Sequence, residues 1–163
     1  MQMKRRSINT PALIRLGASG LYANEFVSAA QRQRAERIMA AVGLTEWVDK
    51  EELLDAITAL SGSGPAYCFL LLELMAKTGE KLGLKSELAQ RFAKQTMLGA
   101  AAMADKSSES PTTLRQNVTS PGGTTERALA IFKEGSFEKL VHRAITGARD
   151  RALELGDSIE GEK

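Results

Sequence analysis

The feature that most constrains the fold of this chain is residues 65–82, a segment predicted to form a helix that is apolar on nearly every face. Pro65 suits the first turn because its φ is already helical, and Gly83 marks the end. A helix without a polar face must be covered on most sides, either inside a core or by a second chain. The segment therefore predicts burial or self-association. Its large side chains are Tyr67, Phe69, Leu70, Leu71, Leu74 and Met75.

The chain from Lys50 onward is predicted to be helical throughout. Apolar residues recur there at helical spacing, between runs bounded by capping residues or glycines. The small residues 99–102 lie inside one run and would allow another helix to cross closely. The other predicted helices are residues 53–60, 86–103, 124–133 and 137–155, with a short segment at 111–118.

The first 49 residues show a different pattern. Residues 19–23 and 46–48 are predicted strands, and residues 28–42 between them are predicted to form a helix. Ser28 is the expected N-cap, and Gly43 is the glycine expected to end this helix. Strand, helix, strand is a single α/β unit, and two strands alone are marginally stable in water. This region therefore resembles the last piece of a larger sheet.

Composition argues against several classes of protein. The formal net charge is +2, from 22 basic and 20 acidic residues, so nothing demands a nucleic-acid partner. The single cysteine, Cys68, excludes an internal disulfide and a thiolate zinc site, and its apolar neighbours predict a core thiol. The longest apolar stretch, residues 66–72, is far shorter than the roughly 20 residues of a membrane span. We expect a cytoplasmic protein without membrane contact.

Two glycine-rich segments, Ser61–Pro65 and Thr119–Thr125, stand directly before predicted helices. A helix N-terminus has unpaired N–H groups and a partial positive charge, and glycines let an anion approach the backbone. Each segment is therefore a candidate cradle for a carboxylate or phosphate. The alternative is ordinary capping, with Ser63 or Gly64 as N-cap and Pro65 in the first turn. The residue pattern leaves both interpretations open.

Other catalytic patterns are missing from the sequence. His142, the single histidine, lies within a predicted helix and is expected at the surface. No cluster of His and Cys suits a metal ion. The glycine pattern that begins at Gly62 has Tyr67 where a dinucleotide fingerprint needs its third glycine. Three carboxylates are predicted to form a solvated helix face: Glu51, Glu52 and Asp55.

Six motifs together are more specific than any one of them. They are Asn-Thr-Pro at 9–11, Ser-Gly-Leu-Tyr-Ala at 19–23, Leu-Leu-Asp-Ala-Ile-Thr at 53–58, Ser-Gly-Ser-Gly-Pro-Ala-Tyr at 61–67, Leu-Gly-Ala-Ala at 98–101 and Val-Thr-Ser-Pro-Gly-Gly-Thr-Thr at 118–125. In this order they resemble the pyrroline-5-carboxylate reductases, enzymes that reduce a cyclic imine to proline with NADPH or NADH. The resemblance extends over residues 9–155, and the motif at 118–125 is its most specific part.

The resemblance implies a mainly α fold. Residues 50–163 would form a helical dimerisation and substrate-binding domain, and residues 1–49 would be the last strands and helix of a Rossmann domain. The chain would form a homodimer through its helical domain, and dimers of this kind can assemble further. It would bind a small-molecule substrate, pyrroline-5-carboxylate or proline, and neither nucleic acid nor a membrane.

The resemblance also implies roles for single residues. Thr58 and Thr125 would be catalytic. The substrate carboxylate would be bound by Ser120, Gly123, Thr124 and Thr125. The nicotinamide end of NADP or NAD would lie against Asn9, Ser63, Gly64 and Pro65, while the pyrophosphate site is absent from this chain. No metal is expected.

Departures from the family pattern qualify these expectations. The family usually has Arg-x-Met-Pro before Asn-Thr-Pro, whereas Ser7 and Ile8 replace the Met-Pro pair here. Ser108, with Glu109 beside it, stands where some relatives carry an acidic residue near the substrate amine. The glycine-rich nucleotide fingerprint is missing, so the isolated chain is expected to be inactive.

Two other functions compete with a reductase. One is a non-enzymatic helical self-association module from a truncated gene. The other is a nucleic-acid binder that uses the basic residues 4–6, which the small net charge disfavours.

Overall fold

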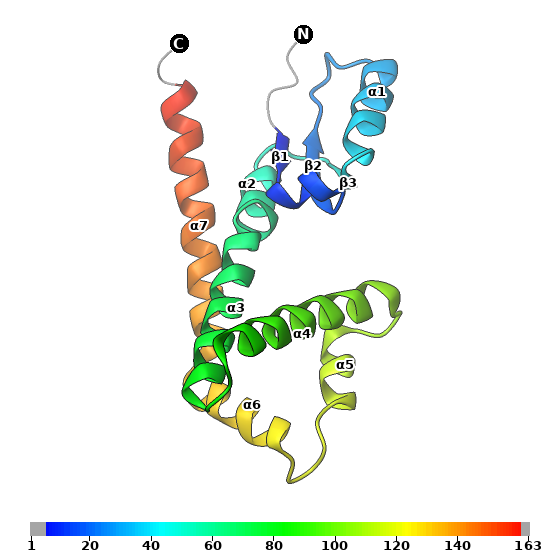
Figure 1. The fold of residues 1–163 in the computed structure, drawn as a ribbon. Coiled ribbons are helices and arrows are strands. Elements are labelled where there is room, and N and C mark those ends of the chain that lie inside the picture. The colour runs from blue at the N-terminus through cyan, green and yellow to red at the C-terminus, as the bar shows by residue number, and fades with distance from the viewer. Residues whose placement is uncertain (1–5, 161–163) are drawn as a thin grey trace. The chain divides into compact units, whose positions relative to one another are not determined.

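The computed structural model describes the backbone of residues 6–160 and the side chains of residues 7–156. The chain forms two compact units (Figure 1). The first unit consists of residues 1–67 and 142–163 and contains the sheet; the second consists of residues 68–141 and is helical. The expected mainly α fold, with strand, helix and strand near its start, is confirmed.

The sheet of the first unit has three strands in the order β1-β2-β3. β2 pairs parallel with β3, while β1 pairs antiparallel with β2. The sequence predicted β2 and β3 but missed β1, because three residues are too few to show an alternating pattern. The bounds are β1 Arg6–Ile8, β2 Gly17–Tyr22 and β3 Gly43–Val48, with a 3₁₀ helix η1 at Thr10–Ile14 and helix α1 at Ala29–Ala40.

Helix α1 begins as predicted at Ser28. The Ser28 hydroxyl accepts from the Gln31 N–H, and the Gln31 side chain accepts from the Ser28 N–H, which completes a capping box. The prediction for Gly43 is wrong, because Ala41 is the C-cap and Gly43 opens β3. Gly43 has a φ of +146°, and a Cβ there would lie 2.0 Å from the Gly17 carbonyl oxygen. Glycine is therefore required by the close pairing of β2 and β3.

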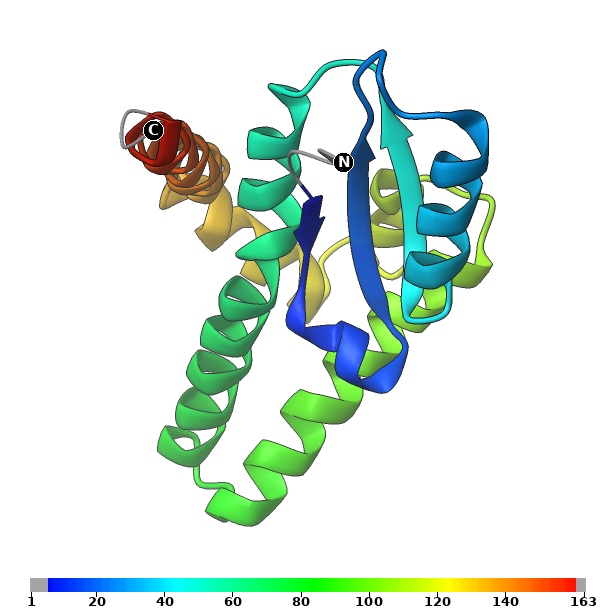
Figure 2. The ribbon, with the colours of Figure 1, turned by 90° about the horizontal axis from the view of Figure 1, so that it is seen from above.

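The core of the first unit lies where helix α2, Leu53–Ile57, packs on β2. Leu21 of β2 is fully buried, and Leu54 of α2 is 2% exposed. Gly20 permits this contact, because a Cβ there would lie 2.6 Å from Ile57 Cδ1 and 3.3 Å from Leu54 Cδ2. In both views the sheet lies between α1 and α2 (Figures 1 and 2). Asp55 is only 3% exposed, so the predicted solvated carboxylate face is wrong at this position.

Residues 53–81 form one uninterrupted helical stretch rather than two helices separated by a loop. α2 passes into a π-helix, η2 at Thr58–Gly62, and α3 follows at Gly64–Lys81. Ser63 between them keeps helical angles, φ −85° and ψ −18°. The predicted loop at Ser61–Pro65 is therefore wrong. The wider π turn accommodates the glycine-rich residues within the helix, and the proline lies at the start of α3, where it is tolerated.

The second unit consists of helices whose positions the sequence predicted to within a few residues at most ends. They are most of α3, then α4 at Ser86–Lys106, α5 at Pro111–Asn117 and α6 at Thr124–Glu134, followed by the first turn of α7. α7 spans Phe137–Glu160 and continues in the first unit. Ser110 caps α5 by accepting from the Thr113 N–H.

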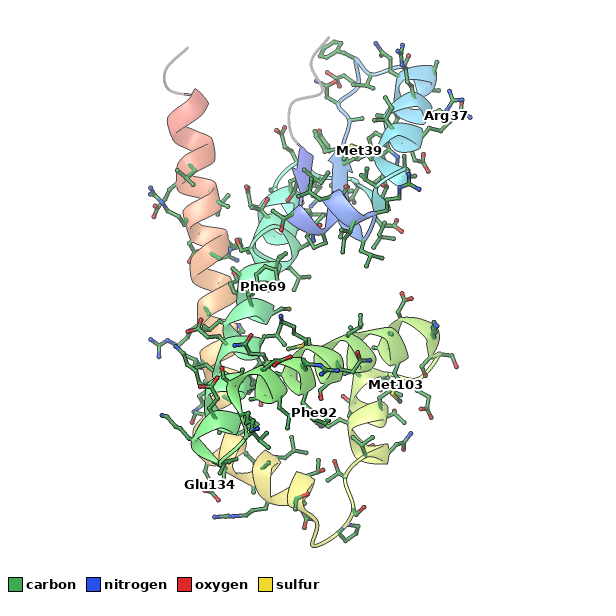
Figure 3. The ribbon with its side chains drawn as sticks, in the orientation of Figure 1. Arg37, Met39, Phe69, Phe92, Met103 and Glu134 are labelled. Atoms are coloured by element: carbon green, nitrogen blue, oxygen red, sulfur yellow. The ribbon has the colours of Figure 1, made fainter. Side chains whose placement is uncertain are left out.

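The buried hydrophobic residues of the second unit are all alanines. They are Ala76, Ala89 and Ala93, and most of the larger apolar side chains of the unit are exposed. Phe69, Phe92 and Met103, labelled in Figure 3, are each about 60% exposed. Cys68 is exposed as well, so the predicted core thiol is wrong for the single chain. An apolar surface of this extent marks a site of association.

Among the described residues, the stretch Leu53–Lys81 is long and apolar enough to cross a membrane by length and composition alone. Only 6% of its most apolar window is buried. The sequence predicted no such span because its longest apolar stretch, residues 66–72, is far shorter than the roughly 20 residues of a membrane crossing. Core helices of soluble proteins and helices covered by a partner pass the same criterion, so the finding locates uncovered apolar surface and does not identify what covers it.

The contact between α2 and β2 gives a first prediction. Gly20→Ala should destabilise the protein by about 1–3 kcal/mol, because the new methyl group overlaps Ile57 Cδ1. Ile57→Val removes that atom and alone should cost about 0.5–1.5 kcal/mol. The double variant should lose clearly less stability than the sum of the single losses in urea unfolding. Strict additivity would contradict the proposed overlap.

Candidate functional site: a π-helical turn and a glycine-rich helix N-terminus

The first predicted group of site residues meets at the π-helix of the first unit. The Ser63 N–H donates to the Thr58 carbonyl oxygen over 2.9 Å, a bond that spans five residues. Isolated π turns are uncommon and are often found at functional sites. Thr58 lies at the start of this turn, and Ser63, Gly64 and Pro65 follow its end, all of them half-buried.

Asn9 connects this turn to the sheet. Its Nδ2 donates to the carbonyl oxygen of Ser61 over 3.2 Å and to the Ser61 Oγ over 3.1 Å. Its Oδ1 accepts from the N–H of Ala18, in β2, over 2.9 Å. The structure therefore brings Asn9 together with Ser61, 52 residues further along the chain.

Thr58 is held by two neighbouring oxygens. Its Oγ1 lies 2.7 Å from the Leu54 carbonyl oxygen and 3.1 Å from the Ser7 Oγ. Because a hydroxyl carries one hydrogen, Thr58 donates to only one of them; if that is Leu54, the Ser7 hydroxyl is free to donate to Thr58. Ser7 is 8% exposed. Sequence reasoning noted Ser7 only as a departure from the family pattern and missed this contact.

The same turn has one further side-chain partner. The Tyr67 hydroxyl donates to the carbonyl oxygen of Ala59, which is fully buried, over 3.2 Å. The sequence placed Tyr67 in the apolar helix 65–82 and in the motif at 61–67, and showed that it interrupts a dinucleotide fingerprint. Its contact shows a different role, since the phenol reaches back from α3 to a carbonyl group of the π-helix.

The second predicted group lies in the second unit, at the start of α6. Gly123 is the N-cap, and its carbonyl oxygen accepts the first helical bond from the Arg127 N–H. The Gly123 N–H donates to the Ser120 carbonyl oxygen over 3.0 Å. Gly122, with a φ of +71°, makes the turn that this bond closes. The N–H groups of Thr124 and Thr125 occupy the first two helical positions, which have no acceptor within a helix.

Sequence reasoning missed Glu126 in this loop. Its Oε2 accepts from the Gly122 N–H over 2.8 Å, which places a negative charge at the positive end of α6. Part of the signal was present in the sequence, because a Glu in the first turn of a helix is favoured by the helix dipole, although Gly123 cannot complete a capping box. The loop at 119–125 therefore already contains one carboxylate that belongs to the chain.

Several described titratable groups lie away from these two sites. Among residues 6–160, no three His, Cys, Asp or Glu side chains lie together as a metal site. His142 is exposed on α7, as predicted. Glu109 accepts a hydrogen bond from Asn117 over 3.1 Å and is exposed. A cavity of about 320 Å³ between α3 and α4 has none of the predicted residues in its lining, and the Glu73 carboxylate there raises the pKa of Lys77.

Comparison with known proteins yields one family. The family model described as "Pyrroline-5-carboxylate reductase dimerisation" matches residues 51–155. A pyrroline-5-carboxylate reductase of Pseudomonas aeruginosa is 54% identical over 151 residues, covering 93% of this chain and 55% of that protein. One of Haemophilus influenzae is 42% identical over 148 residues, covering 90% and 55%. The chain thus spans about half the length of the curated relatives it matches.

Solved structures agree with these relatives. A pyrroline-5-carboxylate reductase from Coxiella burnetii superimposes with a TM-score of 0.88 at 50% identity, covering 93% of this chain and 56% of that one. A pyrroline carboxylate reductase from Plasmodium falciparum, solved with NADP bound, gives a TM-score of 0.86 at 32% identity, covering 93% and 62%.

The contacts of Thr58 can be tested directly. Thr58→Val keeps the shape of the side chain but removes the hydroxyl, which should cost about 1–2 kcal/mol because Leu54 and Ser7 both lose a partner. Thr58→Ser keeps the hydroxyl and should cost less than Thr58→Val in urea unfolding. Equal losses for the two variants would mean that the hydroxyl contributes no more to stability than the methyl group, which would contradict this prediction.

Proposed function

Because the chain belongs to the pyrroline-5-carboxylate reductase family, we propose that it supplies the dimerising and substrate-binding part of an NAD(P)H-dependent reduction of 1-pyrroline-5-carboxylate to L-proline. The observation that carries this proposal is the family match over residues 51–155, together with 54% identity to a reductase. The sheet of the first unit would then be the end of a Rossmann domain.

The loop at 119–125 would bind the carboxylate of the substrate. The N–H groups of Thr124 and Thr125 lie in the first turn of α6, where unpaired donors and the helix dipole favour an anion. The Thr125 hydroxyl adds a further donor beside them. Ser120 and Gly123 would shape the loop, because the bond between them already closes the turn.

The π turn would face the nicotinamide end of the cofactor. A Cβ added at Gly64 would meet no atom within 4 Å, so this side of the turn is open to a flat ring. Ser63 and Pro65 flank Gly64 in the chain, the Ser63 N–H bonds to the Thr58 carbonyl oxygen, and Asn9 supports the turn from the sheet side. No described segment has the glycine-rich strand–turn–helix that holds a pyrophosphate, so the residues present fit one end of NADP or NAD only.

In this reaction NADPH or NADH, when bound, supplies the hydride. A new C–H bond forms at the imine carbon, and the C=N electron pair moves to the nitrogen, which is already protonated. The chain contributes by binding and orienting the substrate through its carboxylate, which requires no histidine base. Thr58 and Thr125 are the hydroxyl groups that we assign to the reacting centre.

The exposed apolar surface of the second unit would be covered by a second copy. The family model is itself a dimerisation domain, and large side chains on α3 and α4 are left without neighbours in the single chain. A membrane suits this surface less well, because α3 carries the exposed ion pair Glu73–Lys77. We therefore propose a cytoplasmic homodimer that needs neither nucleic acid nor a membrane.

The alternative is a self-association module without activity. It is favoured by one observation, that no described segment contains a pyrophosphate site. Both functions predict dimerisation and no turnover by this chain alone. Only the reductase function predicts that the loop at 119–125 binds a carboxylate, so carboxylate binding distinguishes the two. Measurable imine reduction by the purified chain would contradict both functions, because it would require a site for the cofactor pyrophosphate within this chain.

Assembly is the first prediction of this proposal. Light scattering after size exclusion should give about twice the chain mass of 17.6 kDa, because an obligate interface of roughly 2,000 Å² or more is expected. Phe92→Glu should shift the protein to monomer or aggregate. The matched control is Leu13→Glu, also an exposed apolar residue but in the first unit, which should leave the mass unchanged. A folded monomer at micromolar concentration would contradict the proposal.

Carboxylate binding is the second. L-proline should bind the chain, and Thr125→Val should weaken binding about tenfold or more through loss of a hydrogen bond to a charged group. Glu126→Gln should strengthen binding several-fold at low salt, with less effect at high salt, because it removes a like charge from the loop. Glu134→Gln, at the other end of α6, is the control and should change little. Titration calorimetry would measure all four proteins.

A further inference from the structure

One carbonyl group of the π turn lacks the backbone donor that a regular α-helix or π-helix would supply. In an α-helix the Ser61 carbonyl oxygen would accept from residue 65, but Pro65 has no N–H. In a π-helix it would accept from residue 66, but the Ala66 N–H donates to the Ser63 carbonyl oxygen over 3.0 Å. Because the Ser61 residue is half-buried, a donor from elsewhere in the protein would stabilise its carbonyl group.

Asn9 is that donor. Its Nδ2 reaches the Ser61 carbonyl oxygen at 3.2 Å and the Ser61 hydroxyl at 3.1 Å. The orientation of the amide follows from its partners, because the Ala18 N–H can only face the oxygen and the Ser61 carbonyl group can only face the nitrogen. A side chain at position 9 must therefore offer a donor on one side and an acceptor on the other.

We propose that Asn9 is a positioning residue that replaces the helical donor which Pro65 cannot supply, and so holds the π turn in register against β2. Thr58 and the Ser63–Pro65 segment belong to this turn, and the Ser63 N–H to Thr58 bond closes it. The role of these residues toward the cofactor rests on the proposed function; the link between Asn9 and Pro65 does not.

This assignment explains a pairing of two motifs that stand far apart in the chain. Asn9 belongs to the Asn-Thr-Pro motif and Pro65 to the Ser-Gly-Ser-Gly-Pro motif. The residues that surround Asn9 and Pro65 in the sequence give no sign that the two positions are connected. The structure joins them through a third residue, because the proline withholds an N–H from Ser61 and the asparagine supplies one. Because Asn9 bonds to both Ala18 and Ser61, a displacement of residues 9–18 would also move the π turn.

The test is a double-mutant cycle between positions 9 and 65, measured by amide hydrogen exchange in the intact chain. Asn9→Asp is nearly isosteric and keeps the acceptor for the Ala18 N–H but loses the donor to Ser61. It should speed exchange of the Ser63 amide about tenfold and leave the Ala18 amide protected. Pro65→Ala restores a backbone donor for Ser61, so Asn9→Asp in that background should change Ser63 exchange less than twofold.

Two outcomes would overturn the proposal. The first is a tenfold effect of Asn9→Asp that persists unchanged with Pro65→Ala, which would show that Asn9 does not act through the missing donor. The second outcome applies if Asn9→Asp alone fails to fold. Pro65→Ala should then restore folding, and a double variant that stays unfolded would contradict the positioning role of Asn9. Asn24→Asp, a change at an asparagine that accepts a hydrogen bond in an exposed turn, is the matched control and should leave Ser63 unaffected.

The cofactor is tested separately, so that the two ideas can fail independently. NADPH added to the unaltered chain should shift the amide resonances of Ser63 and Gly64, and the shifts should shrink in Asn9→Asp. No shift in the unaltered chain would contradict the nicotinamide assignment while the exchange cycle still decides the role of Asn9. Equal shifts in the two proteins would contradict positioning by Asn9.

Discussion

The first unit depends on the contact between α2 and the bare backbone of β2 at Gly20. Because no side chain intervenes there, Ile57 and Leu54 lie directly on the strand, and Leu54 and Leu21 are removed from water. Burial of one such leucine stabilises the fold by about 2–3 kcal/mol. The position of α2 in turn fixes the π turn that follows it without a break, and the hydrogen bonds of Asn9 and Ser7 with Ser61 and Thr58 add a second connection to the same sheet.

The second unit differs from the first, because few of its large apolar side chains are buried within the single chain. Its buried hydrophobic residues are alanines, while its phenylalanines and leucines are largely exposed. Each exposed apolar side chain forgoes the roughly 25 cal/mol per Å² that burial would supply, so the unit gains much of its stability only when another surface covers it. For this unit, folding and assembly are therefore expected to be one process, as in obligate dimers whose separated chains are unstable. The helices themselves form from local signals, since Ser110 and Gly123 cap their starts.

No basic side chain forms a described hydrogen bond within the loop before α6, the candidate carboxylate site. It offers backbone donors and hydroxyl groups, and the charged side chain bonded within it is Glu126, which is negative. An arriving carboxylate would compete with that internal anion for the same helix dipole, which limits affinity. Under the proposed function, weak binding of this kind would suit a site that must also release a product with the same carboxylate, since tight binding of substrate and product alike gives no gain in rate.

The sequence by itself determined the helices of the second unit, β2, β3 and α1, because apolar spacing, Ser28 and the glycines act over a few residues. Its motifs also identified Asn9, Thr58 and the two glycine-rich segments as candidate site residues. Tertiary structure decided the rest. Asp55 is buried and Cys68 exposed, since burial depends on what other segments cover. β1 forms because β2 offers it an edge, although a strand of three residues carries no periodic signal. Ser61–Pro65 stays helical, because its missing donor comes from Asn9 and no local pattern contains a partner 52 residues away.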